Sequence, residues 1–126
     1  MIAKSPEGAV ELLDRAFNAG DVETLLEFYE DEAVVVTQPG HVARGREELK
    51  EFFGRVMQSG MSARQHKTYT LEADGIALFL SRWSLQRGHG DGEQTLVATT
   101  VFRRQSDGGW RALIDNSFGP SVLGEN

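Results

Sequence analysis

The chain has 126 residues and no cysteine, 40% of it is hydrophobic, and 19 acidic side chains against 13 basic ones give a formal net charge of −6. The lack of cysteine excludes thiolate catalysis, cysteine-ligated zinc and iron–sulfur clusters, and the acidic excess argues against a nucleic-acid partner, which needs a basic face. No segment has the apolar length of a signal peptide or a membrane span, so we expect a cytoplasmic protein with no membrane contact.

The first part of the chain carries the signals of two helices. The first is predicted to begin at Ser5, whose hydroxyl can cap the opening turn ahead of a proline, and to end at Gly20. Asp21 is predicted to cap a second, shorter helix. The apolar side of that second helix would consist of Leu25, Leu26, Phe28 and Tyr29.

A short strand, an irregular link and a third helix are expected next. The strand covers Val34–Val36 and runs into Thr37 and Gln38 just before Pro39-Gly40, so its last polar side chains are expected beside a cavity. The third helix is predicted over Glu47–Ser59. Its buried stripe would be Leu49, Phe52, Phe53, Val56 and Met57.

The second half of the chain has the composition of long strands. Three turn signals, Asp74-Gly75 and the loops "GHGDG" and "SDGG", separate four segments rich in threonine, valine, leucine and aromatic residues. The strands are predicted over residues 62–72, 76–87, 94–105 and 109–118. Consecutive hairpins form an antiparallel sheet with the helices on one side, which is an α+β fold. The chain contains no repeat or linker, so we expect one domain over residues 1–126.

Neither face of these strands is fully polar. On the third long strand one face carries Leu96, Ala98 and Phe102, while the other carries Val97 and Val101. A sheet covered on one side only would alternate apolar and polar residues, so a second layer is expected. The second layer predicted here is the same sheet of another subunit in a two-fold homodimer; ordinary exposed apolar residues on a twisted sheet are the alternative. The expected interface residues are Leu80, Val97, Val101 and Leu113.

Three local signatures, taken in order, resemble one known superfamily. The segment "AFNAGDVETLLEFYEDEAVVV" resembles the start of the nuclear transport factor two-like superfamily, and "ARGREELKEFF" resembles the opening of its third helix. The segment "VFRRQSDGGWRALIDNS" is similar to the closing hairpin of its SnoaL-like and ketosteroid-isomerase-like branches. The resemblance implies a cone-shaped fold in the order α-α-β-α-β-β-β-β, a curved, mainly antiparallel sheet around an apolar pocket, and dimerisation through the outer sheet face.

The resemblance also allows the ketosteroid isomerase chemistry to be tested by position. Those enzymes use a carboxylate base just before a proline, together with a tyrosine on the first helix and a protonated aspartate on a central strand. The corresponding positions here are Gln38, Leu13 and Thr100. A carboxamide cannot take a proton at neutral pH and leucine donates nothing, so the resemblance implies that this reaction is not available.

The inward-facing residues define the expected ligand site, although no catalytic set is identified. An apolar cavity with a few polar groups fits a small-molecule site, whereas polar groups bonded only to backbone and aromatic rings that fill the cone would leave none. His66 is also a candidate acid–base group, with an ordinary strand histidine as the alternative, and no histidine spacing indicates a metal. The expected ligand-binding residues are Phe17, Gln38, His66, Trp83, Thr100, Asn116 and Phe118.

Carboxylates are expected to be scarce in this pocket. Strict alternation along the last strand places Asp115 on the outer face with Arg111 and Leu113, and Asp14 is expected to be exposed on the first helix. A shift of one residue in the placement of Asp14 would turn it inward and would reopen the question of acid–base chemistry.

Two functions therefore remain open from the sequence. The first is a SnoaL-like protein that binds a small apolar or aromatic ligand, and, if it is an enzyme, a cofactor-independent isomerase, cyclase or dehydratase. The alternative is a dimerisation or association module with a vestigial pocket. An open cavity on which Gln38, Thr100 and Asn116 converge would favour the first function, and a cone filled by Trp83, Phe102 and Phe118 would favour the second.

Overall fold

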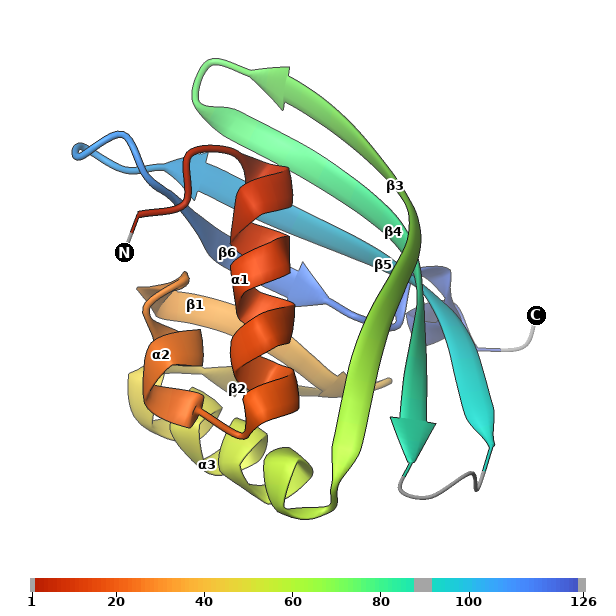
Figure 1. Ribbon diagram of the computed structural model, residues 1–126. Coiled ribbons are helices and arrows are strands. Elements are labelled where there is room, and N and C mark those ends of the chain that lie inside the picture. Colours follow the sequence, from red (N-terminus) through yellow and green to blue (C-terminus); the bar gives the residue numbers. More distant parts are fainter. Residues whose placement is uncertain (1, 88–91, 125–126) are drawn as a thin grey trace.

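The computed structural model describes residues 2–87 and 92–124 and confirms the α+β fold class. In these residues, three helices lie on one side of a six-stranded sheet of order β2-β1-β6-β5-β4-β3 (Figure 1). The helices are α1 (Pro6–Ala19), α2 (Val22–Leu26) and α3 (Gly45–Gln58), with a 3-10 helix, η1 (Gly119–Leu123), after the last strand. The strands are β1 (Tyr29–Gln38), β2 (His41–Arg44), β3 (Met61–Ala73), β4 (Ile76–Arg87), β5 (Glu93–Arg104) and β6 (Trp110–Asn116).

The segment between α2 and α3 differs from the sequence-based prediction. The expected short strand at Val34–Val36 is the middle of the ten-residue strand β1, and the expected irregular link contains a further strand, β2. Tyr29, predicted on the second helix, opens β1 instead. The observed element order is therefore α-α-β-β-α-β-β-β-β. The expected "GHGDG" turn, which includes His89, lies mostly outside the described residues.

The ends of α1 and the start of α2 form where the sequence predicts them. The Ser5 hydroxyl accepts a hydrogen bond from the Gly8 amide at 2.9 Å, and the left-handed Gly20 (φ +73°) ends the helix. A carboxylate oxygen of Asp21 then accepts from the Thr24 amide at 3.1 Å and caps α2. Two residues, Gly20 and Asp21, separate the two helices. This tight connection folds α2 back against α1.

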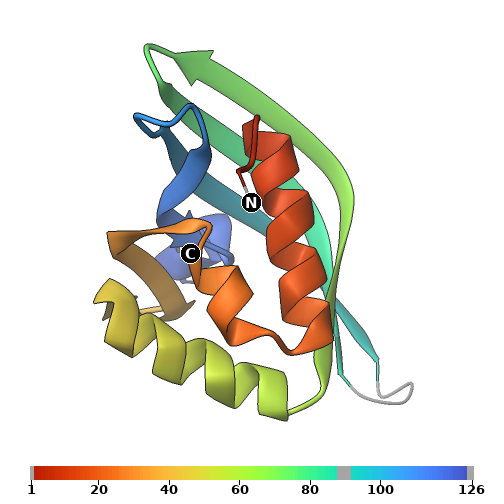
Figure 2. The same cartoon turned by 60° about the vertical axis from the view of Figure 1, so that its left-hand side comes forward.

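The sheet curves around α1, so that the helix lies within its concave side (Figures 1 and 2). The strands β3, β4, β5 and β6 form an antiparallel meander, and β1 joins β6 in parallel. Helix α3 lies below α2, against β1 and β2 (Figure 2). The largest fully buried side chains lie in this interior: Leu25, Leu26, Phe28, Val35, Leu49 and Phe102.

A bulge in β6 changes which side chains face inward. Between β5 and β6 the pairing steps from Phe102↔Ala112 to Val101↔Ile114, so Leu113 is an extra residue on β6. Because side chains alternate between the two faces, one extra residue reverses the facing of every residue after it. Ile114 is therefore 43% exposed on the outer face, and Asp115 faces inward opposite Thr100.

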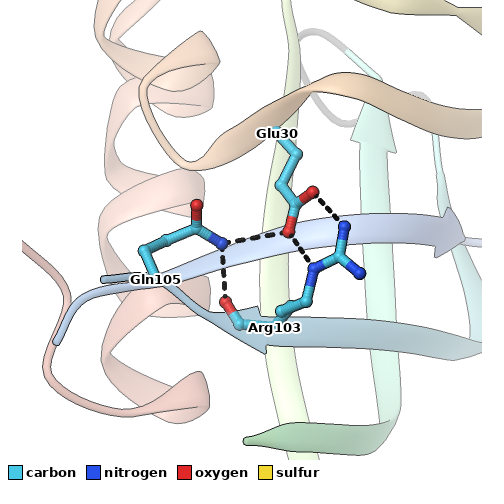
Figure 3. Close-up of polar contacts among 3 residues, drawn as sticks. All are labelled: Glu30, Arg103 and Gln105. Atoms are coloured by element: carbon cyan, nitrogen blue, oxygen red, sulfur yellow. Dashed lines mark hydrogen bonds and ion pairs between the residues drawn. The ribbon is translucent and has the colours of Figure 1, made fainter. Parts of the chain in front are cut away.

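A charged contact joins the two strands that flank β6. Arg103 on β5 donates to both carboxylate oxygens of Glu30 on β1, at 2.8 and 2.6 Å, and Gln105 adds a third donor at 3.0 Å (Figure 3). These donors lower the pKa of Glu30, because they favour its charged form. Since the two strands are not neighbours in the sheet, this cluster holds β1 in place across β6.

Within the described residues, no helix is both long enough and apolar enough to cross a membrane.

Candidate functional site

A cavity of about 110 Å³ lies between α1 and the concave face of the sheet. Helices α1, α2 and α3 and strands β1, β3, β4, β5 and β6 all contribute to its wall. Much of the wall is aromatic, with the rings of Phe17, Tyr29, Phe53, Phe79, Trp83 and Phe102. The cone is therefore not completely filled by its aromatic side chains.

One polar cluster in the wall is built around Asp115 on β6. The Tyr29 hydroxyl donates to one of its carboxylate oxygens at 2.5 Å, and the Thr100 hydroxyl donates to the other at 3.2 Å. Burial raises the pKa of Asp115, and the hydrogen bonds from Tyr29, Thr100 and Ser117 oppose that rise because they favour the carboxylate. Burial, with the nearby charge of Asp115, also raises the pKa of Tyr29 well above its usual value, so the phenol stays protonated as the donor.

A second polar cluster connects α1 to strands β3 and β4. The side-chain amide of Gln65 donates to Asp14 at 2.9 Å, and the Ser81 hydroxyl donates to the carbonyl oxygen of the same amide. With its oxygen bonded to Ser81, the Gln65 amide presents its nitrogen to Asp14. Burial raises the pKa of Asp14 to about 6; the Gln65 hydrogen bond opposes this rise, and the negative charge of Asp115 adds to it.

This arrangement gives Asp14 the properties of a proton carrier near neutral pH. A general acid or base works best when its pKa lies close to the working pH, and Asp14 is shifted toward neutrality within a largely apolar cavity. Within the described residues, Gln65 is the only side chain that donates to Asp14, which leaves its second carboxylate oxygen available to a ligand. Asp115, held by its donors, is better suited to hold charge in place than to exchange protons.

Three of the predicted ligand-binding residues line this cavity. Phe17 lies on α1, Trp83 on β4 and Thr100 on β5, as the helical and alternating patterns predicted. The indole N–H of Trp83 donates to the Ser117 carbonyl oxygen at 3.0 Å, so this ring is fixed in the wall. The hydroxyl of Thr100 is directed to Asp115.

The other four predicted residues, Gln38, His66, Asn116 and Phe118, lie outside the cavity wall, so the predicted convergence of Gln38, Thr100 and Asn116 on the cavity was wrong. Gln38 is exposed on the β1–β2 hairpin and bonds to His41 at 3.2 Å, because β1 continues past the cavity before it turns. Asn116 accepts from the backbone amides of Phe118 and Gly119 at 3.2 and 3.0 Å and so caps the turn into η1. His66 is the extra residue of the β3 bulge, is exposed, and bonds to Ser84 rather than to a group in the cavity.

Two expectations about carboxylates were wrong. Asp115 was expected on the outer face, but the β6 bulge at Leu113 turns it into the cavity. Asp14 was expected to be exposed, but it lies in the wall beside Leu13. The signal for Asp14 was present in the sequence, because Val10, Leu13, Asp14 and Phe17 follow the i, i+3, i+4, i+7 spacing of one helix face.

Sequence patterns did not identify Tyr29 or Gln65 as residues of the site. Tyr29 was assigned to a helix, whereas its actual place at the start of β1 brings its hydroxyl to β6. Gln65 precedes the bulge at His66 and pairs with Trp83, so its side chain faces inward. Uninterrupted alternation from Thr68 would have placed Gln65 on the outer face. No local sequence signal indicates the bulge at His66 or the bulge at Leu113.

The part of the chain that the structure describes contains no group of three histidine, aspartate or glutamate side chains placed to hold a metal ion. The two carboxylates of the cavity are instead surrounded by hydroxyl and amide donors.

Residues 9–113 match the family model of the SnoaL-like domain. That span runs from the first turns of α1 to β6 and includes Asp14, Tyr29, Gln65 and Thr100. A search of curated protein sequences gave no match.

Solved structures with the same fold carry several functional descriptions. A candidate dehydratase of the NTF2-like family from Streptomyces avermitilis is 23% identical, with a TM-score of 0.78 over 90% of this chain and 92% of that one. A candidate ketosteroid isomerase from Shewanella frigidimarina is 17% identical, with a TM-score of 0.77 over 90% and 95% of the two chains. A candidate calcium/calmodulin-dependent protein kinase type II association domain from Thiobacillus denitrificans is also 17% identical, with a TM-score of 0.76 over 92% and 95%. At these identities the similarity establishes the fold.

Proposed function

This chain belongs to the SnoaL-like domain family, and we propose that it is a cofactor-independent acid–base enzyme that acts on a small, mainly apolar molecule. In this proposal the substrate binds in the cavity between α1 and the sheet, and Asp14 takes up or delivers a proton. Isomerisation, cyclisation and dehydration are reactions that need only such proton transfers within a shaped, mostly dry site.

The observation that carries the proposal is the environment of Asp14. Its carboxyl group lies in an aromatic cavity, is oriented by Gln65, and has a pKa raised to about 6. A perturbed carboxyl group in a concave apolar site is the usual mark of a functional group, whereas a carboxylate that serves only structure is more often paired with a basic side chain. The proposed chemistry differs from that of the ketosteroid isomerases, because its proton carrier would lie on α1 and not at Gln38.

The size of the cavity limits the part of the ligand that it can enclose. An apolar cavity of roughly 150 Å³ holds a benzene ring. The cavity here is smaller, at about 110 Å³, so it encloses a short branched chain or part of a ring, and a larger ligand would extend beyond it.

A thermal-shift screen of small apolar alcohols, ketones and amines, followed by turnover measurements on the hits, tests this proposal. Hits should raise the melting temperature of the wild-type protein. Incubation of each hit in heavy water, followed by NMR, should reveal deuterium incorporation, isomerisation or loss of water. Asp14→Asn should slow that change by about 100-fold or more, because general acid–base catalysis contributes at least that much. The proposal fails if no compound stabilises the protein, or if the variant turns over as fast as the wild type.

A second candidate function is a dimerisation or association module, and the exposed outer face of the sheet favours it. Leu78, Val97 and Ile114 are 40%, 41% and 43% exposed there, next to Ile76 at 39%. Contiguous exposed apolar residues mark interaction surfaces. We infer that this face pairs with the same face of a second copy; among the expected contact residues, Val97 is exposed, and Leu80, Val101 and Leu113 are half-buried. Pairing of this kind is compatible with a working cavity on the opposite face.

A further inference from the structure

The hydrogen-bond donors in the cavity wall are already committed to acceptors of the protein itself. Tyr29 and Thr100 donate to Asp115, Gln65 donates to Asp14, and Ser81 donates to Gln65. The Trp83 indole donates to a backbone carbonyl oxygen. A ligand that needs donors, such as a carboxylate, a phosphate or an enolate, would therefore have to break bonds that already exist in the protein.

Acceptors and negative charge, in contrast, are in excess. Two carboxyl groups line the cavity, and among the described residues of its wall there is no lysine, arginine or histidine. Burial and the negative charge of Asp115 both oppose ionisation of Asp14. A positively charged group on a ligand would relieve this repulsion and would bond to the free carboxylate oxygen of Asp14.

The aromatic part of the wall suits the same kind of ligand. Six rings line the cavity, and the faces of aromatic rings attract cations, most strongly where water is excluded. An alkyl or aryl group would be buried against these rings while an attached ammonium group reached the carboxylates. Apolar walls and paired acceptors together match an organic cation with a compact apolar body.

A second hollow lies on the outer side of Asp14. Asp14 lines this hollow of about 290 Å³ together with Glu7 and Glu11 of the same helix, Gln65 and Thr68 of β3 and Phe79 of β4. Arg15 is drawn to Glu11 at 3.3 Å, and both are exposed, with 70% and 72% of their side chains accessible. The basic side chain of α1 nearest to Asp14 in sequence is thus paired outside the cavity.

We propose that the cavity selects ligands that carry positive charge, namely small protonated amines with an apolar body, over neutral and anionic molecules of the same shape. This inference rests on the proposed small-molecule site and specifies its substrate class. By the same geometry, the site favours reactions in which positive charge develops on the substrate over reactions that pass through an oxyanion.

Three ligands of matched shape test the inference: benzylamine, which is protonated over the pH range used, benzyl alcohol and benzoate. Their affinities for the full chain are measured by calorimetry or by ligand-detected NMR at pH 8 and at pH 5. At pH 8 we expect benzylamine to bind about tenfold more tightly than benzyl alcohol, a difference of ~1.4 kcal/mol, and benzoate to bind most weakly. At pH 5 Asp14 is mostly protonated, so the preference for the amine should shrink.

Two variants distinguish the effect of a negative charge in the cavity wall from that of a negative charge elsewhere on α1. Asp14→Asn keeps the shape of the side chain and an acceptor for Gln65, and it should abolish most of the amine preference. Glu11→Gln removes the same charge from the same helix outside the cavity, and it should change the preference by less than about twofold, because an exposed charge is screened by solvent.

The possible outcomes distinguish this inference from the proposed function. Equal or tighter binding of benzyl alcohol or benzoate would overturn the cation preference but would leave a small-molecule site in place. An equal loss in both variants would assign the preference to the general negative charge of α1 and would overturn the role of the cavity. The absence of binding by all three ligands would overturn both the inference and the proposed site.

Discussion

Tyr29 and Asp115 lie 86 residues apart in the chain, yet the hydroxyl of one donates to the carboxyl of the other at 2.5 Å. The contact joins β1 to β6, the parallel pair of the sheet, and it lies in the wall of the cavity. The contact therefore connects the pairing of β1 with β6 to the hydrogen bonding of Asp115 in the cavity.

Removal of this donor should destabilise the protein in a pH-dependent way. We expect Tyr29→Phe to lower the free energy of unfolding by about 1–3 kcal/mol at pH 8, where buried Asp115 is left with fewer donors. The loss should shrink toward pH 4, because a protonated carboxyl group needs the donor less. Urea unfolding at both pH values measures it. Tyr69→Phe, on a tyrosine that is 63% exposed, is the matched control and should be neutral. An equal loss at both pH values would indicate altered packing rather than the lost hydrogen bond.

Asp14 should make the protein less stable as the pH rises. Its pKa is raised from 3.8 to about 6, so its contribution to stability is fully present below about pH 3.8 and is lost as the pH rises through 6. Asp14→Asn is neutral at every pH. We therefore expect the variant to gain up to ~3 kcal/mol over the wild type between pH 4 and pH 7.5 in urea unfolding.

The titration of Asp14 can also be observed directly by carboxyl-carbon NMR. We expect its midpoint near pH 6. Asp21 is an internal reference, because its hydrogen bonds to the side chain and the backbone of Thr24 lower its pKa. A midpoint for Asp14 near that of an ordinary aspartate would contradict both its burial and its assigned role.

The outer sheet face should determine the oligomeric state. Val101→Glu places a charge between Leu78 and Ile114, its cross-strand partners on the exposed apolar face, and should convert a dimer to a monomer, measured by size-exclusion chromatography with light scattering. Val42→Glu, on a residue of β2 that is 47% exposed at the far edge of the sheet, should leave the mass unchanged. A wild-type protein that is already monomeric at micromolar concentration would refute this interface.

The turn after β6 should tolerate no side chain at Gly119. A Cβ at this position would lie 2.2 Å from the Val97 carbonyl oxygen, and the backbone has φ +53°. We expect Gly119→Ala to cost about 3 kcal/mol or more, whereas Gly40→Ala, with φ +88° and no neighbour within 4 Å, should cost only about 1–2 kcal/mol. Because Trp83 bonds to the Ser117 carbonyl oxygen beside this turn, its fluorescence should change in the Gly119 variant. Equal costs for the two variants would contradict the close approach to β5.

Much of the fold could be predicted from local patterns. The serine cap, the glycine stop and the apolar spacing predicted α1, and alternation with turn signals predicted the four long strands within a few residues of their observed ends. The inward facing of Phe17, Trp83 and Thr100 followed from the same periodicities. These features depend on interactions between residues close in sequence, which is why one sequence was sufficient to predict them.

The composition of the site depended on tertiary structure. One extra residue at Leu113 turns Asp115 inward, and another at His66 leaves Gln65 facing Asp14, while the length of β1 carries Gln38 past the cavity. A bulge is set by how a strand pairs with its neighbours, and a strand end by where its partner stops, so neither is encoded in a local pattern. The sequence by itself determined the class of fold and the apolar lining of the cone. Only the packed sheet determined that Asp115, and not the carboxamide of Gln38, lies with Asp14 inside it.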